Sequence, residues 1–317
     1  MKTLRYRIKY IVSILLVMTI LSGCGRTNDA SKSGEDISAF MEDYRSAVSS
    51  SDYIVHALGG EEDRSYINSI DMLDKAYKEG LRVFEADISF TSDGVLVLAH
   101  SGEDNVWSKN DWEKRLGQKY PFDDESVKDY ECYDVDKHLC SYEVFKSFKI
   151  QGRYTANSFA ELLDYMEEHV DMYLMVDAGH RSYADAKAYY EAIVEAADGR
   201  TQVLDRLIAG GQTTDMVKAA REAYDFPLIN LYFDKDENRE SIIYSAEDFV
   251  RYCDAESITS ISIAKEVFTE GVAKVISDSD LIIYVFTEND ESEAEHILSL
   301  GADMVGTDFL WSDEKKN

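Results

Sequence analysis

Three acidic residues and two histidines stand where apolar runs of the sequence end. Glu85 and Asp87 lie two apart within one such run, so on a strand both carboxylates point to the same face. Asp177, His56 and His100 each close another apolar run. Neighbouring carboxylates repel one another, and a hard divalent cation with oxygen ligands would relieve that repulsion. Each residue alone is explained better by a structural role, such as a helix cap or an exposed position, but five that converge at strand ends favour a functional site.

Short apolar runs alternate with amphipathic stretches from residue 52 onward, which indicates parallel βαβ units. The predicted strands are Tyr53–Leu58, Arg82–Phe90, Val95–His100, Met172–Asp177, Arg206–Gly210, Pro227–Phe233, Ser257–Ile263, Leu281–Thr287 and Met304–Thr307. The predicted helices are Ser69–Glu79, Ser158–His169, Tyr183–Ala197, Thr214–Tyr224, Ala246–Cys253, Ala264–Ile276 and Ser292–Leu300. The order favours a distorted (β/α)8 TIM barrel, whose active site lies at the carboxyl ends of the strands. A doubly wound open sheet is the alternative.

One pair of predicted strands breaks the alternation, because only residues 91–94 separate them. Asp93-Gly94 is a strong signal for a two-residue hairpin turn. With that turn, Asp87 lies directly opposite His100. The hairpin strand is therefore additional to the eight strands of the barrel.

Residues 101–154 follow neither pattern and are too long for an ordinary loop between a strand and a helix. The segment is rich in charged and aromatic residues. We interpret it as an insertion above the mouth of the barrel, after the second-strand hairpin.

The composition excludes some classes of protein. The 45% of hydrophobic residues can build a large core, which excludes wholesale disorder. The formal net charge of −29 disfavours nucleic acid as a partner and disfavours docking of the protein surface on an anionic membrane.

The amino terminus has the features of a secretory signal. Basic residues precede the apolar run Ile11–Leu21, which is too short to span a bilayer. The following Ser22-Gly23-Cys24 resembles a bacterial lipobox, in which Cys24 is lipidated. We expect a signal peptide over residues 1–23, a lipidated Cys24 with a flexible tether over 24–51, and the barrel over 52–312. The lipid would hold the domain at the extracellular face of the cell membrane.

Three cysteines remain after Cys24. Cys132 and Cys140 are close enough in sequence to form a disulfide outside the cell, which would leave Cys253 unpaired. Two separate thiols explain the spacing equally well.

The amino-terminal block resembles the glycerophosphodiester phosphodiesterase family, within the superfamily that also holds phosphatidylinositol-specific phospholipase C. The residues that carry the resemblance are His56, Asn68-Ser69, Glu85-Ala86-Asp87, Thr91-Ser92-Asp93-Gly94, Val97 and His100. The closing segments 285–290, 300–303 and 307–308 are also similar to the family. The form His56-Ala57-Leu58-Gly59-Gly60 resembles a divergent bacterial branch.

The resemblance implies one divalent cation, Ca²⁺ or Mg²⁺, held by Glu85, Asp87 and Asp177. It implies that His56 and His100 form an acid–base pair, which suits imidazole because it titrates near neutral pH. The substrate would be a phosphodiester of glycerol or another polyol, such as a glycerophosphodiester, a phospholipid headgroup or a teichoic-type polymer.

Three positions depart from the family pattern. Ala57 and Gly179 stand where an Arg and a Lys are usual, and Ser101 stands where an Asp is usual. Arg181 or His180 are candidates to replace the missing phosphate contacts, and Gln212 is a candidate substrate contact at another strand end.

The departures leave a second hypothesis, a barrel lipoprotein that binds a phosphorylated or sugar ligand without turnover. A third hypothesis is a surface protein that uses the aromatic insertion for interaction.

Overall fold

The computed structural model describes residues 34–61, 65–100, 141–147, 149–150, 153–179, 181–233 and 245–312. The chain divides into two compact units, Met1–Met41 and Glu42–Asn317. The first unit is described only over the first turns of helix α2 (Gly34–Val48). No helix in the described ranges is long and apolar enough to span a bilayer.

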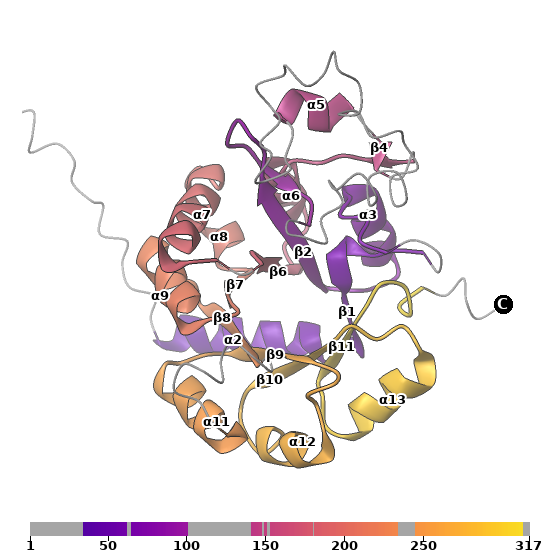
Figure 1. Cartoon of the computed structure of the whole chain (residues 1–317), viewed down its shortest axis with the longest axis vertical. Coiled ribbons are helices and arrows are strands. Elements are labelled where there is room, and N and C mark those ends of the chain that lie inside the picture. The colour runs from indigo at the N-terminus through magenta and orange to yellow at the C-terminus, as the bar shows by residue number, and fades with distance from the viewer. Residues whose placement is uncertain are drawn as a thin grey trace, which may run out of the picture. The chain divides into compact units, whose positions relative to one another are not determined.

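The second unit is a closed barrel of eight parallel strands, so the predicted TIM barrel is confirmed and the open sheet is wrong (Figure 1). The barrel strands are β1 (Tyr53–Val55), β2 (Val83–Phe90), β6 (Tyr173–Asp177), β7 (Leu207–Gly211), β8 (Leu228–Phe233), β9 (Ser260–Ala264), β10 (Ile282–Phe286) and β11 (Met304–Thr307). The ring closes because β1 pairs with β11 on one side and with β2 on the other. A single residue pair, Val55 with Phe84, joins β1 to β2.

Helices surround the barrel strands in Figure 1. They are α3 (Ile70–Lys78), α6 (Phe159–Glu168), α7 (Tyr183–Ala196), α8 (Thr201–Leu204), α9 (Thr214–Ala223), α11 (Ala246–Ala255), α12 (Glu270–Ile276) and α13 (Glu291–Ser299). Most begin at a Ser, Thr or Asp whose side chain accepts a backbone N–H of the first turn. The strands are buried on both sides, by these helices and by the barrel interior, so their sequences read as continuous apolar runs.

The hairpin is present, but its predicted register is wrong by one residue. Strand β3 (Leu96–Leu98) is antiparallel to β2 with Ile88 opposite Leu98. Asp87 therefore lies beside Ala99, whose N–H donates to the Asp87 carbonyl at 2.9 Å. His100 follows the end of the strand and lines the same cavity as Asp87.

The turn of the hairpin explains the shift. Thr91 and Val95 pair across the turn, with the Thr91 N–H donating to the Val95 carbonyl at 2.8 Å, so three residues form the loop. Gly94 takes a φ of 83°, the left-handed conformation that closes a three-residue loop with a bulge. The Asp93-Gly94 signal thus located the turn and gave the wrong loop length.

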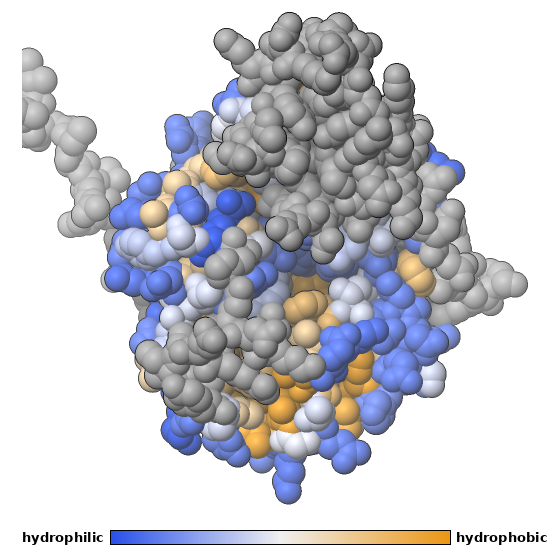
Figure 2. Space-filling view, viewed as in Figure 1, coloured by the Kyte–Doolittle hydropathy of each residue, from blue (hydrophilic) through white to orange (hydrophobic). Residues whose placement is uncertain are grey.

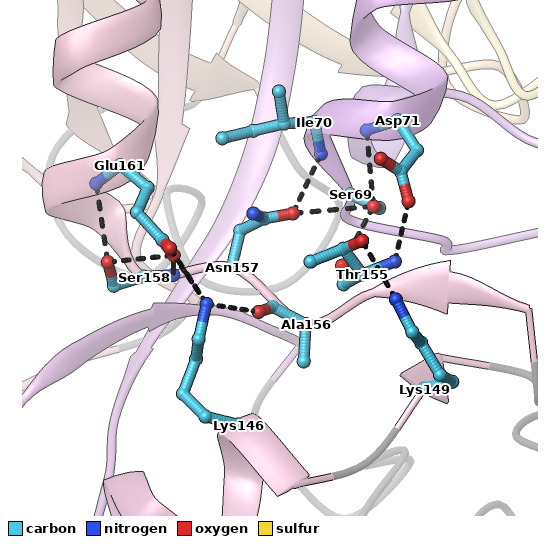
Figure 3. A network of polar contacts seen from close by, with 10 residues as sticks. All are labelled: Ser69, Ile70, Asp71, Lys146, Lys149, Thr155, Ala156, Asn157, Ser158 and Glu161. Carbon is cyan, nitrogen blue, oxygen red and sulfur yellow. Dashed lines mark hydrogen bonds and ion pairs between the residues drawn. The ribbon is translucent and has the colours of Figure 1, made fainter.

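The described end of the insertion makes polar contacts with two neighbouring helices. It comprises α5 (Tyr142–Ser147), β4 (Lys149–Ile150) and β5 (Tyr154–Thr155), and residues 101–140, 148 and 151–152 of the predicted insertion lie outside the described residues. Lys146 of α5 bonds Glu161 of α6 at 2.8 Å, and the Thr155 N–H of β5 donates to Asp71 of α3 at 2.7 Å (Figure 3). These contacts connect the segment to the first turns of two neighbouring helices.

The flexible tether predicted for residues 24–51 is wrong over α2, which is helical from Gly34 to Val48. Residues 24–33 lie outside the described residues. Tyr44 is fully buried and its hydroxyl bonds that of Tyr284 in β10. Arg45 donates to the Asp280 carbonyl at 2.7 Å. Residues Tyr44 and Arg45 therefore belong to the folded barrel rather than to a linker.

Candidate active site

A cavity of about 230 Å³ opens at the carboxyl ends of the barrel strands. Figure 2 shows a hollow in the face that Figure 1 presents, with apolar surface on one side of it. The lining includes the five residues singled out by their types and spacing: His56, Glu85, Asp87, His100 and Asp177. The structure therefore brings them together in the place where TIM barrels carry their chemistry.

Glu85, Asp87 and Asp177 form a compact acidic cluster. Asp87 and Asp177 are direct partners on the paired strands β2 and β6, and Glu85 points to the same side of β2 as Asp87. One oxygen atom from each of the three residues lies within 4.8 Å of the others. That spacing suits a single cation between three carboxylates.

The electrostatics of the cluster also fit a cation. Burial and the neighbouring charge of Asp87 raise the pKa of Glu85 well above its ordinary value, and the same two causes raise the pKa of Asp177. The Glu85 Oε1 atom is buried and has no hydrogen-bond partner among the described residues. An unpaired buried oxygen of this kind is costly, and three carboxylates are the hard ligands that Ca²⁺ and Mg²⁺ prefer.

Backbone and amide groups hold the carboxylates in place. The Ala57 N–H donates to Glu85 Oε2 at 2.7 Å, and the Gly179 N–H donates to Asp177 Oδ1 at 2.6 Å. Asn68 donates to Asp87 Oδ2 at 2.7 Å. The other oxygen of Glu85 has no partner among the described residues, while the Tyr232 hydroxyl donates to the second oxygen of Asp177 at 3.4 Å. Ala57 takes a φ of 47°, so the chain turns sharply just after His56 to bring its N–H toward Glu85.

His56 is oriented by an acidic partner that the sequence did not single out. Its Nδ1 lies 2.9 Å from Asp308 Oδ1, while its Nε2 is 4.0 Å from Glu85 Oε2. Asn289 donates to the other oxygen of Asp308 at 2.7 Å and so fixes that carboxylate. Burial lowers the pKa of His56, but the hydrogen bond to Asp308 and the nearby carboxylates outweigh burial and raise it to about 9. The Asp308 bond thus leaves Nε2 to face the acidic cluster.

His100 lies on the other side of Tyr66, whose ring meets both imidazoles edge-on. The ring centroids are 4.8 Å apart for His56 and Tyr66, and 5.5 Å apart for Tyr66 and His100. The His100 Nδ1 atom is buried without a hydrogen-bond partner in the described part of the chain. Both histidines therefore present a ring nitrogen to one cavity.

The two candidate substrate contacts differ in position. Gln212 follows β7 and lines the cavity. Arg181 does not line it, because its guanidinium lies over the Tyr189 ring, 4.6 Å from the centroid. No Lys or Arg is among the described residues that line the cavity. Lys265, just past β9, instead pairs with Glu288 at 2.9 Å.

Several predicted residues lie outside the described part of the chain: Cys24, Ser101, Cys132, Cys140 and His180. Cys253 is buried and forms no disulfide.

We expect Asp308→Asn to lower kcat by about 10–100-fold with little change in KM, because hydrogen bonds to charged groups contribute about 1.5–3 kcal/mol. Asp308 acts by positioning His56, so the loss falls on the chemical step. Steady-state kinetics with a diester substrate that the protein cleaves measures this change in kcat. Asp303→Asn, at the opposite end of β11, is the matched control and keeps the wild-type rate. Equal losses in the two variants would contradict the positioning role.

Comparison with known proteins identifies the family. Residues 59–311 match the model of the glycerophosphoryl diester phosphodiesterase family, and His56 lies just before the first matched residue. No curated protein matches the chain.

Solved structures share the fold at low sequence identity. A glycerophosphodiester phosphodiesterase from Parabacteroides distasonis has 16% identity and a TM-score of 0.57, covering 81% of this chain and 93% of its own. One from Thermotoga maritima has 18% identity and a TM-score of 0.57, with 84% and 98% covered. An Oleispira antarctica phosphodiesterase, solved with the product sn-glycerol-3-phosphate, has 14% identity and a TM-score of 0.60, with 86% and 98% covered. Since the family model spans most of the chain, this protein belongs to the glycerophosphoryl diester phosphodiesterase family.

Proposed function

We propose that this protein cleaves a phosphodiester of glycerol or another polyol with the help of one divalent cation. The observation that supports this most strongly is the cluster of Glu85, Asp87 and Asp177 in a cavity that both His56 and His100 line. The cluster fits a cation, and the histidines supply the proton transfers that diester cleavage requires.

Each histidine has one role in the proposed reaction. One takes the proton of the attacking hydroxyl, which belongs to water or to a neighbouring alcohol of the substrate, as its oxygen bonds to phosphorus. The bond from phosphorus to the leaving alcohol breaks, and the other histidine donates a proton to that alcohol. A bound cation would neutralise charge on the phosphoryl oxygens. Asp308 holds the His56 ring so that Nε2 faces the reacting group.

The proposed location is the outer face of a bacterial membrane. The signal segment and Cys24 support lipid attachment, with the chain bound to the membrane through that lipid alone. Phospholipid headgroups and glycerol-phosphate wall polymers are then the phosphodiesters within reach.

A specific observation favours a second candidate function, binding without turnover. The described lining of the cavity offers no Lys or Arg to the phosphate, and Arg181 packs on Tyr189. A cation and two histidines would then hold a phosphorylated ligand that the protein does not cleave.

The test is product release from purified protein with glycerophosphocholine, a glycerol-phosphate polymer and phosphatidylglycerol vesicles. We expect at least one to be cleaved with millimolar Ca²⁺ or Mg²⁺, and expect a chelator to abolish the reaction, because three uncompensated carboxylates repel a phosphodiester anion. Restoring the cation restores the rate. Tight binding of glycerol 3-phosphate with no cleavage of any substrate would favour the second candidate.

A further inference from the structure

The chain enters the folded barrel at the amino-terminal ends of the strands. Residues 42–48, the part of α2 in the second unit, contact the chain at two strands on opposite sides of the ring. The fully buried Tyr44 lies beside Tyr173, the first residue of β6, with 5.0 Å between the ring centroids. Arg45 donates to the carbonyl of Asp280, which precedes β10, at 2.7 Å. The helix therefore crosses this end of the barrel.

The candidate active site lies at the other end of the same strands. Strand β6 begins at Tyr173, which packs on α2, and ends at Asp177, which lines the cavity. We call the surface around Arg45, Val170 and Asp280, which lie at the amino-terminal ends of the strands, the entry face. The entry face and the mouth of the cavity thus lie at opposite ends of the barrel.

Lipid attachment at Cys24 would bring the entry face to the bilayer before the mouth. Residues 24–33 precede α2 and span at most about 35 Å when fully extended. Residues 34–41 add about 12 Å as a helix. To turn its mouth to the bilayer, the domain would need the same chain to run along the outside of the barrel as well. Stretching a tether costs conformational entropy, so the entry face is favoured as the side nearest the lipid.

The charge and the apolar surface of the protein favour the same orientation. The formal net charge is −29, and the described lining of the cavity holds three carboxylates and no Lys or Arg, so an anionic phospholipid surface repels the mouth. Surfaces that bind a bilayer expose contiguous apolar patches. Phe286 beside the mouth is partly buried, and among the described residues Val170 of the entry face is the one large apolar side chain that is exposed.

We infer that the anchored protein turns the mouth of its active site away from the bilayer that carries it. Its substrate is then a glycerol or polyol phosphodiester in the aqueous phase, dissolved or extending from the wall as a polymer, and not a phospholipid of that bilayer. The inference rests on the proposed function and on the lipid at Cys24, and it selects between the two kinds of phosphodiester within reach.

Energy transfer to the bilayer measures the orientation without turnover. The full lipidated chain is reconstituted in vesicles of phosphatidylglycerol and phosphatidylcholine that contain an acceptor-labelled lipid. Val170→Cys marks the entry face, and Glu266→Cys, exposed just past β9, marks the mouth. Both variants carry Cys132→Ser and Cys140→Ser, and the fully buried Cys253 is protected from the label.

A donor fluorophore on Val170→Cys is expected to transfer more energy to the lipid acceptor than the same fluorophore on Glu266→Cys, because the entry face lies nearer the bilayer. Equal transfer from the two positions, or greater transfer from Glu266→Cys, would overturn the inference.

Cleavage gives a second readout. We expect the wild-type protein, anchored in these vesicles at high dilution, to cleave added glycerophosphocholine with the kcat/KM that it shows in detergent. The phosphatidylglycerol of its own vesicles should stay intact, because the mouth faces away from it. Loss of that phosphatidylglycerol would contradict the orientation.

The outcomes separate the inference from the proposed function. A protein that cleaves glycerophosphocholine but transfers energy equally from both positions overturns the orientation and leaves the phosphodiesterase intact. A protein that cleaves neither substrate, yet transfers more energy from Val170→Cys, keeps the orientation and overturns the proposed reaction. Absence of a lipid on Cys24, read by mass spectrometry, overturns the inference alone.

Discussion

Replacing His56 by alanine is expected to lower kcat/KM by about 10²–10⁴-fold, the contribution of a positioned general acid or base. His56 is partly buried at the mouth of the barrel, and its Nε2 faces the acidic cluster because Nδ1 is bonded to Asp308. Alanine removes the proton transfer but leaves the three carboxylates in place. The variant therefore keeps its cation-dependent stabilisation while it loses turnover, which kinetics and thermal unfolding measure separately.

His296→Ala is the matched control, since this histidine is exposed on α13 and does not line the cavity. It should keep the wild-type kcat/KM. A His56→Ala protein that retains its cation-induced stabilisation and cleaves at the wild-type rate would exclude His56 from the chemical step. A loss of folding would instead appear as a lower unfolding midpoint in the absence of the cation.

Glu85→Gln is expected to abolish both turnover and the rise in thermal midpoint that Ca²⁺ or Mg²⁺ produces. A cation that binds only the native state at 100 times its Kd stabilises the wild type by about 2.7 kcal/mol. Glutamine keeps the size of the side chain but removes the charge that draws the ion. It also removes the repulsion from Asp87 that raises the pKa of Glu85, so the variant without cation should be no less stable than the wild type.

Glu195→Gln on the exposed face of α7 is the control for this change, and we expect a wild-type response to the cation. The result that contradicts the assignment is an equal rise in midpoint for the wild type and Glu85→Gln. Such a rise would mean that the ion binds elsewhere on this acidic chain.

The barrel was predictable because its strands are buried on both faces and separated by amphipathic helices. The predicted strand Met172–Asp177 and the observed Tyr173–Asp177 differ by one residue. The predicted helix Tyr183–Ala197 likewise ends at Ala196. The apolar runs therefore predicted the positions of the strands and helices. The acidic residues of the site stand at the carboxyl ends of the predicted strands.

The features that the sequence did not predict depend on contacts between distant residues and on the conformation of loops. Asp308 is 252 residues from His56, so only closure of the barrel brings them together. Asp308 nevertheless follows an apolar strand as Asp177 does, and that signal could have found it. Tyr66 lies in the loop before α3, where no periodicity fixes the direction of a side chain.

Helix α2 was missed because its polar first turn continues the composition of the tether. Phe40, Tyr44 and Val48 recur every four residues and mark one apolar face, which a search by helical spacing could have found. The predicted register of the hairpin was wrong because the same Asp-Gly pair closes both two-residue and three-residue loops.

A crystal of the protein soaked in Mn²⁺ and examined by anomalous scattering shows directly whether the three carboxylates bind a cation. We expect one strong peak in the mouth of the barrel, within about 2.0–2.6 Å of oxygen atoms from Glu85, Asp87 and Asp177. A barrel mouth without such a peak, at a concentration of Mn²⁺ that supports cleavage, would mean that these three carboxylates do not hold the catalytic cation.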